Sequence, residues 1–100
     1  MYIYNVTVNI SDAKHKEWLQ WMQEVHIPDV MATNLFIKHQ LVKVLVQEEE
    51  GTTYSIQYYV KDRETLQLYQ EVYAPKLQQE HQQKFEGHFV AFRTLLEVVE

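Results

Sequence analysis

The stretch "YIYNVTVNISD", from Tyr2 to Asp12, contains a strand and the start of a helix. Apolar or aromatic residues occupy every second position from Tyr2 to Ile10, and this period of two is typical of a half-buried strand. Ser11 or Asp12 then offers a side-chain oxygen that caps a helix N-terminus. The helix is predicted from one apolar stripe with helical spacing, formed by Trp18, Trp21, Met22 and Val25.

Three further strands are predicted along the chain. Residues 36–46 and 53–60 form two of them, joined by a polar turn at residues 48–51, in which Gly51 allows a positive φ. Residues 88–99 form the last strand. The two strands around the short turn are expected to pair as an antiparallel hairpin.

A second helix precedes the last strand. Asp62 caps it, and Gly87 ends it after Phe85. Its apolar face consists of Leu66, Tyr69, Tyr73 and Leu77. The order βαββαβ predicts a single ferredoxin-like α+β domain over residues 1–100, in which a four-stranded antiparallel sheet carries two helices on one face. With right-handed crossovers, the first and third strands are central.

The face of the sheet away from the helices is also expected to be apolar. If the helices cover Tyr4 and Ile56, the opposite face still holds several large apolar residues, and such a patch usually marks an interface. Polar residues alternate with them, which suits an interface better than a core. We therefore expect a homodimer in which two sheets pack face to face as a dimeric α+β barrel. The residues expected in this interface are Asn5, His39, Leu41, Gln57, Tyr59, Phe89, Arg93 and Leu95.

The composition excludes several kinds of site. The chain has no cysteine, which rules out disulfides, thiol nucleophiles and iron–sulfur clusters and fits a reducing compartment. Its two glycines cannot form a glycine-rich phosphate loop. The net charge is −5, and no basic residue or glycine precedes the aromatic residues of "TTYSIQYYV", so we expect no nucleic-acid partner. No run resembles a signal peptide or a membrane span, and we expect a cytoplasmic protein without membrane contact.

His26 is the candidate catalytic residue. Pro28 has no N–H for the carbonyl of Glu24, and its ring crowds that carbonyl, so the helix is expected to bend or end here. At a helix C-terminus the dipole favours the imidazolium form and holds titration near neutral pH. The more common role of such a histidine is a helix cap or boundary residue. Asn34 is expected to end the following turn in the left-handed conformation.

Aromatic side chains are concentrated where the helices and the sheet are expected to meet. Such a concentration is more often plain core, but hydroxyl and indole donors on apolar bodies also suit an aromatic ligand in a cleft. Pro75 interrupts the second helix and would widen such a cleft beside Tyr73. The residues expected to line it are Tyr4, Trp21, Met22, Tyr58, Tyr73 and Phe92.

Arg93 is a second charged candidate. It shares strand parity with Phe89 and Leu95, so it is expected to point into the dimer interior, where its charge needs a carboxylate, a carbonyl or an anionic ligand. Structural pairing across the interface is the more common of these roles. The same holds for His39 and Tyr59.

A metal site has little support in the sequence. His15 and His26 are about 16 Å apart on one helix at a rise of 1.5 Å per residue, too far to share an ion. We expect neither a metal nor another cofactor.

Four pieces of the sequence carry a family resemblance: "YNVTVNI", "WLQWMQEVHIPDVMATNLF", "YAPKL" and "GHFVAFRTLLE". In this order, over nearly the whole chain, they resemble a small bacterial family known only as a domain of unknown function, within the dimeric α+β barrels. The resemblance implies distant relatives among cofactor-independent monooxygenases, muconolactone-type isomerases, haem-degrading enzymes and EthD-like proteins. No catalytic motif of those relatives matches residues of this sequence, and topology alone does not fix function.

Two functions remain open at this point. The first, which we favour, is a non-catalytic dimeric module that binds a small molecule or a partner. The second is a cofactor-independent enzyme, monooxygenase-like or isomerase-like, that acts on a small aromatic or lactone-like substrate with His26 as acid or base.

Overall fold

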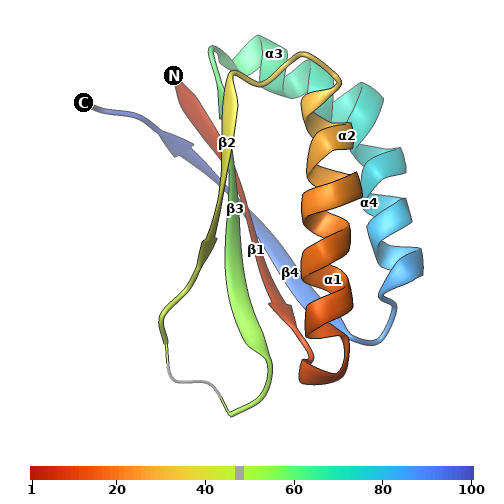
Figure 1. Ribbon diagram of the computed structural model, residues 1–100. Coiled ribbons are helices and arrows are strands. Elements are labelled where there is room, and N and C mark those ends of the chain that lie inside the picture. Colours follow the sequence, from red (N-terminus) through yellow and green to blue (C-terminus); the bar gives the residue numbers. More distant parts are fainter. Residues whose placement is uncertain (47–48) are drawn as a thin grey trace.

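The computed structural model describes residues 1–46 and 49–100, and it confirms the ferredoxin-like order of elements (Figure 1). The sheet is antiparallel, with the strand order β2-β3-β1-β4, so the first and third strands are central as expected. The turn expected at residues 48–51 includes Glu48, which lies outside the described residues. The four strands are β1 (Tyr2–Ile10), β2 (Lys38–Lys43), β3 (Thr52–Val60) and β4 (Phe89–Glu97).

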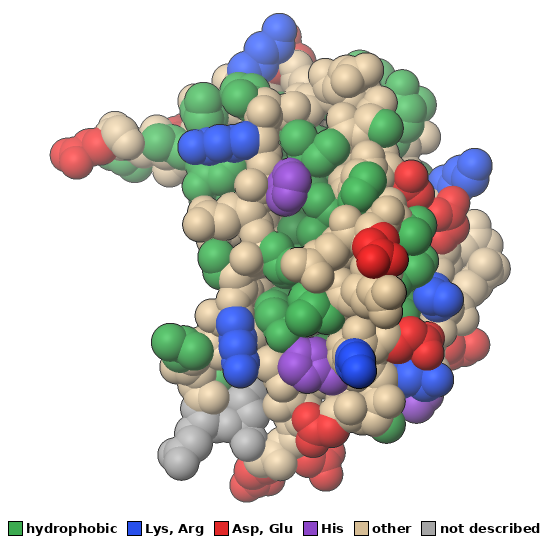
Figure 2. Space-filling model, in the orientation of Figure 1, with side chains coloured by type: hydrophobic (Ala, Val, Ile, Leu, Met, Phe, Trp, Pro, Cys, Tyr) green, Lys and Arg blue, Asp and Glu red, His purple; other side chains and the backbone are tan. Residues whose placement is uncertain are grey.

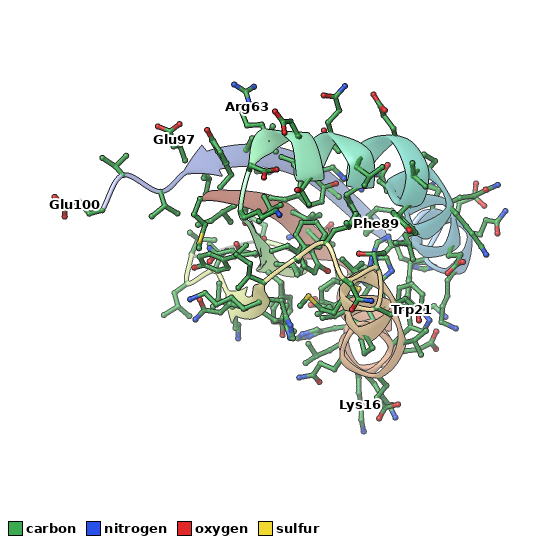
Figure 3. All side chains as sticks on the ribbon, turned by 90° about the horizontal axis from the view of Figure 1, so that it is seen from above. Lys16, Trp21, Arg63, Phe89, Glu97 and Glu100 are labelled. Carbon is green, nitrogen blue, oxygen red and sulfur yellow. The ribbon has the colours of Figure 1, made fainter. Side chains whose placement is uncertain are left out.

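Two long helical segments cover one face of the sheet (Figures 1 and 3). Seen from above in Figure 3, Lys16 and Arg63 point outward from these segments. The first segment consists of the 3-10 turn η1 (Asp12–Lys14), α1 (His15–Trp21), the π-turn η2 (Met22–His26) and α2 (Ile27–Met31). The second consists of α3 (Arg63–Leu68), the π-turn η3 (Tyr69–Tyr73) and α4 (Ala74–Lys84).

Each helical segment passes its proline through a π-turn. The N–H of Ile27 donates to the carbonyl of Met22, five residues back, and the helix then continues through Pro28. The N–H of Ala74 donates to the carbonyl of Tyr69 in the same way just before Pro75. Proline has no backbone N–H to donate. The wider π-turn before each proline lets the helix continue past it although this hydrogen bond is missing. The first helix therefore does not end at His26, which was one of the two alternatives expected there, because it runs on to Met31.

Three other predicted helix ends are confirmed, but the predicted cap of the first helix is wrong. Ser11 precedes η1 without a side-chain capping hydrogen bond among the described residues, and Asp12 is the first residue of η1. The side chain of Asp62 accepts a hydrogen bond from the backbone N–H of Thr65 at 2.8 Å, which caps α3. Asn34 has a φ of 62° after α2, and Gly87 has a φ of 80° after α4. Both residues adopt the left-handed conformation that ends a helix.

The core lies between the helices and the inner face of the sheet. Trp18 and Phe85 are fully buried there, beside Ile10 and Val60. Figure 2 shows hydrophobic side chains along the seam between the sheet and the helices, whereas charged side chains cover the outer helical surface. Within residues 1–46 and 49–100, no helix is long and apolar enough to cross a membrane.

The register of β4 differs from the prediction. Val8 lies opposite Ala91 and Val6 lies opposite Arg93, and directly opposed residues in an antiparallel pair share a face. The helix-facing residues of β4 are therefore Phe89, Ala91, Arg93 and Leu95. The prediction places Phe89, Arg93 and Leu95 on the far face and is wrong for these three.

Two other residues predicted in the interface lie on the helix side of the sheet, and one residue predicted in the cleft lies on the far face. Leu41 lies opposite Ile56 and His39 lies opposite Tyr58, so the register of β2 gives both of them helix-side positions. Phe92, expected in the cleft, is on the far face and is 62% exposed. The sequence of β4 does not decide which of its faces is buried, because large apolar residues occur at both its even-numbered and its odd-numbered positions.

The far face of the sheet nevertheless carries an apolar surface, which we call the open face. Asn5, Gln57 and Tyr59 lie on it, as predicted. Val90 is 70% exposed and Phe92 is 62% exposed on the same face, opposite Asn9 and Thr7 of β1. These are large apolar groups left in contact with water.

Candidate functional site

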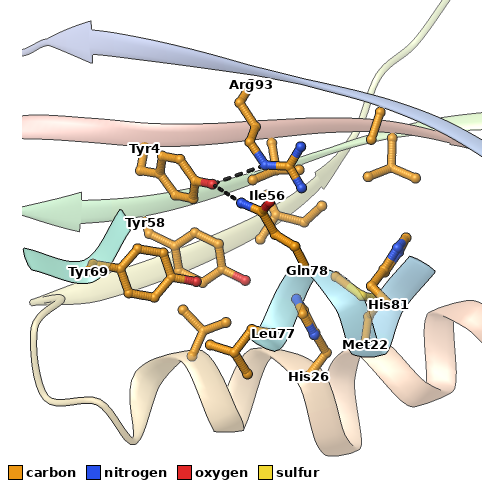
Figure 4. A pocket seen from close by; sticks show the side chains of 14 residues that line it. Tyr4, Met22, His26, Ile56, Tyr58, Tyr69, Leu77, Gln78, His81 and Arg93 are labelled. Carbon is orange, nitrogen blue, oxygen red and sulfur yellow. Dashed lines mark hydrogen bonds between the residues drawn. The ribbon is translucent and has the colours of Figure 1, made fainter. Parts of the chain in front are cut away.

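The candidate site is a small chamber between the inner face of the sheet and the two helical segments (Figure 4). Its volume is about 30 Å³, which is room for one or two water molecules. Both π-turns contribute to its wall, with Met22 and His26 from η2 and Tyr69 from η3. π-turns are rare and occur frequently at functional sites. The polar residues around the chamber are Tyr4, His26, Tyr58, Tyr69, Gln78, His81 and Arg93.

Arg93 and Gln78 converge on the hydroxyl of Tyr4 (Figure 4). The Nε of Arg93 donates to this oxygen at 3.0 Å, and the Nε2 of Gln78 donates to it at 3.3 Å. Tyr4 itself is buried. Because its oxygen accepts two hydrogen bonds, its own O–H is left to donate elsewhere. The three side chains come from β4, α4 and β1 and form one polar network at the chamber.

His26 lies inside the chamber and not at a helix end. Its ring stacks on Trp21, with ring centroids 5.0 Å apart and an interplanar angle of 28°. Its Nδ1 is buried and has no hydrogen-bond partner among the described residues. Burial lowers the pKa of His26 from 6.5 to about 4, against the attraction of Asp29 and with a further contribution from the Arg93 charge. The expectation of an imidazolium at a helix C-terminus is therefore wrong, and the ring is neutral at pH 7.

His81 is the second histidine of the site, and the sequence did not single it out. The indole N–H of Trp18 donates to its Nε2 at 2.8 Å. An indole only donates, so this nitrogen accepts and the neutral ring carries its proton on Nδ1. Burial lowers the pKa of His81 to about 4, and electrostatic interactions with His26 and Arg93 lower this pKa further. The rings of His26 and His81 are 5.8 Å apart, centroid to centroid.

Two buried tyrosines complete the inner wall. Burial raises the pKa values of Tyr58 and Tyr69 well above the usual range, so both hydroxyls stay protonated. Neither hydroxyl makes a hydrogen bond within the part of the chain that the structure describes. They are therefore available as donors toward a molecule in the chamber.

An open groove adjoins the chamber between α4 and β4. Its volume is about 520 Å³, and Gln78, His81, Ala91 and Arg93 line both spaces. These four residues therefore lie between the chamber and the groove. The chamber alone is too small for an organic molecule, but the groove falls within the range of typical ligand sites, about 300 to 1,000 Å³.

The residues expected to bind a ligand separate into two groups. Tyr4, Met22 and Tyr58 line the chamber together with His26. Trp21 packs against His26 from outside the chamber. Tyr73 is exposed and lines a different groove, between α2 and α4. Phe92 is on the open face, as described above.

Sequence reasoning missed Gln78 and His81 and misplaced Arg93. It placed Tyr69 on the buried face of the second helix but did not assign it to the site. Gln78 and His81 follow Pro75 in the second helical segment, and a proline after a wider turn shifts which residues face inward. The one available signal was the position of Pro28 and Pro75, each six residues after the start of a π-turn. In the described part of the chain, no group of three or more His, Cys, Asp or Glu side chains could hold a metal ion.

Comparisons with known proteins agree with this fold. A dimeric ferredoxin-like protein from an uncultured marine organism superimposes with a TM-score of 0.75 at 12% identity, over 99% of this chain and 95% of that chain. An EthD family protein from Bacillus halodurans gives a TM-score of 0.71 at 13% identity, over 99% and 100% of the two chains. SnoaB, a cofactor-independent oxygenase from Streptomyces nogalater, gives 0.69 at 11% identity, over 99% and 94%. Identities this low show the fold alone.

The sequence itself matches one family. No curated protein matches it. The family model for a domain of unknown function, DUF4286, matches residues 1–99. This match confirms the resemblance to a family of unknown function, and the chain therefore belongs to the DUF4286 family, with a ferredoxin-like fold.

Proposed function

We propose that this protein is a homodimeric module that binds a small organic molecule in the chamber and the adjoining groove. The observation that carries the proposal is the buried Nδ1 of His26, which faces no partner within residues 1–46 and 49–100. A buried polar atom without a hydrogen bond costs about 1 to 3 kcal/mol, and a ligand or an ordered water would remove that cost. The absence of cysteine fits a cytoplasmic location for this module.

The arrangement of the site favours binding over catalysis. A histidine that acts as acid or base is usually held through its second nitrogen by a partner that fixes its tautomer and direction. His26 lacks such a partner among the described residues. Its lowered pKa also makes it a weak base. These properties suit a neutral hydrogen-bonding group in a binding pocket.

Blocking the junction between chamber and groove tests the proposal. Ala91 lines both spaces, so Ala91→Trp fills the junction without changing any charge. A thermal-shift screen of aromatic acids, amides and quinones should identify compounds that raise the melting temperature of the wild type. Those shifts should vanish in Ala91→Trp and persist in the control Ala13→Trp, whose position is exposed. His26→Ala, with a circular dichroism spectrum to check folding, provides a second test of the same site.

Two outcomes would contradict the binding function. One is a panel in which no compound shifts the melting temperature of the wild type. The other is a set of shifts that are equal in the wild type, Ala91→Trp and His26→Ala.

The open face supports the homodimer. Val90 and Phe92 are exposed there, and a second copy of the same sheet face would cover them. The structural neighbour from a marine organism is described as dimeric. Sedimentation should therefore give twice the chain mass of 12.1 kDa at micromolar concentration. Phe92→Lys should shift the protein toward the monomer, whereas Val72→Lys, at an exposed helical position, should not. A monomeric wild type would refute the dimer.

A second candidate function is cofactor-independent catalysis on a small aromatic or lactone-like substrate. It is favoured by the neutral ring of His26 in an enclosed chamber, because such a ring can accept a proton from a bound substrate. Incubation with aromatic and lactone compounds, followed by mass spectrometry, tests it. Product that forms with the wild type and not with His26→Phe would support an enzyme. Unchanged compounds would leave the binding module as the function.

A further inference from the structure

Among the described residues that line the groove between α4 and β4, one carries a full charge. This lining consists of Pro75, three glutamines of α4, His81 and, from β4, Phe89, Val90, Ala91 and Arg93, and it includes no Asp or Glu. His81 is neutral at pH 7 because burial lowers its pKa. In a chain with a net charge of −5, a groove of this size whose described lining has an arginine as its one charged residue is electrostatically distinct.

Arg93 has donors that the protein does not use. Its Nε is held by the Tyr4 hydroxyl at 3.0 Å. Within residues 1–46 and 49–100 it forms no ion pair, and its two terminal nitrogens make no hydrogen bond. The guanidinium group is thus anchored through one nitrogen while the others remain free. A planar guanidinium binds a carboxylate through two parallel hydrogen bonds.

The rest of the groove suits the apolar body of such a ligand. Phe89 and Pro75 provide flat apolar surfaces, and the glutamine amides provide uncharged donors and acceptors at the rim. Phe89 is itself held in place by His81, whose ring lies edge to face at 4.3 Å between centroids. We propose that the ligand of this site is a small organic monocarboxylate, with its carboxylate on Arg93 and its apolar body in the groove. This inference rests on the proposed binding function and names its ligand class.

The histidines would report such an anion. The positive charge of Arg93 lowers the pKa values of both His26 and His81, as a smaller contribution beside burial. A carboxylate bound to Arg93 offsets that charge, so it should raise both pKa values. A neutral ligand in the same groove lacks this effect.

The experiment compares benzoate with benzamide, which has nearly the same shape and no charge. By isothermal titration of the full chain, benzoate should bind about tenfold more tightly than benzamide or better, as a charge-assisted pair does. Arg93→Gln should remove this preference, and Arg93→Lys should retain part of it. The other arginine supplies the control: Arg63 points outward from α3, so Arg63→Gln should bind benzoate as the wild type does (Figure 3). Raising the salt concentration should weaken benzoate binding alone.

Each outcome decides a different claim. Equal affinities of the wild type for benzoate and benzamide, or equal losses in Arg63→Gln and Arg93→Gln, would overturn the monocarboxylate assignment. The proposed binding function would survive that result, because benzamide would still occupy the groove. Failure of both probes to bind the wild type would overturn the monocarboxylate assignment, and the broader screen on Ala91→Trp would then decide the binding function separately.

Discussion

The burial of His26 predicts a specific dependence of stability on pH. In the unfolded chain a histidine has a pKa near 6.5, and in the folded protein burial lowers the pKa of His26 to about 4. Between these two values the unfolded state binds a proton that the folded state does not. The free energy of unfolding must therefore fall as the pH is lowered from 6.5 toward 4. Well above pH 6.5, where the histidine is neutral in both states, the protein keeps its full stability.

The magnitude follows from the two pKa values. At about pH 5 the unfolded histidine is almost entirely protonated, whereas about a tenth of the folded population is. Relative to about pH 7.5, this difference lowers the free energy of unfolding by about 2 kcal/mol for one histidine. His81 has a similarly lowered pKa, so it makes a separate contribution in the same direction.

Urea unfolding, followed by tryptophan fluorescence at the two pH values, measures this dependence. His26→Gln has no titrating group in the chamber, so its loss of stability between the two pH values should be smaller than that of the wild type by about 2 kcal/mol. His39 is exposed, and His39→Gln should keep the wild-type dependence. All samples need the same chain concentration, because a dimer gains stability with concentration. Equal pH dependence in the wild type and His26→Gln would show that the ring is not buried in its neutral form.

Two further changes test the packing around the site and the hairpin. Trp18→Phe leaves the buried Nε2 of His81 without its 2.8 Å donor, and urea unfolding should show a loss of about 1 to 3 kcal/mol. Gly51→Ala should destabilise more than Gly87→Ala in a thermal melt. Both glycines have positive φ, but a Cβ at Gly51 would lie 2.7 Å from the carbonyl oxygen of Ile10, whereas a Cβ at Gly87 would meet no atom of the described residues within 4 Å. Equal melting temperatures of the two alanine variants would contradict the close contact.

The fold could be predicted from the sequence because its signals are local and agree with one another. The alternation in residues 2–10, the cap at Asp62 and the glycine at 87 each indicate an element or its end without reference to the rest of the chain. These signals fix the order of elements, and the order with right-handed crossovers fixes the topology. None of them depends on the register of an edge strand.

The site could be predicted only in part because it depends on register. A shift of one residue reverses every side chain of a strand, and β4 has large apolar groups in both parities. Arg93 was therefore expected in the dimer interior, although it lies opposite Val6 on the helix side. His26 was expected at a helix end because a proline usually stops a helix, but the π-turn before Pro28 carries the helix past it. The first error concerns which face of β4 is buried, and the second concerns how a helix passes a proline.

A crystal structure of the protein with benzoate would test the central claim most directly. The account predicts benzoate in the groove between α4 and β4, with both carboxylate oxygens within hydrogen-bond distance of Arg93 and the ring against Phe89. It also predicts an ordered water in the chamber that donates to, or accepts from, the Nδ1 of His26. A groove without benzoate at saturating concentration, together with a dry chamber, would contradict it.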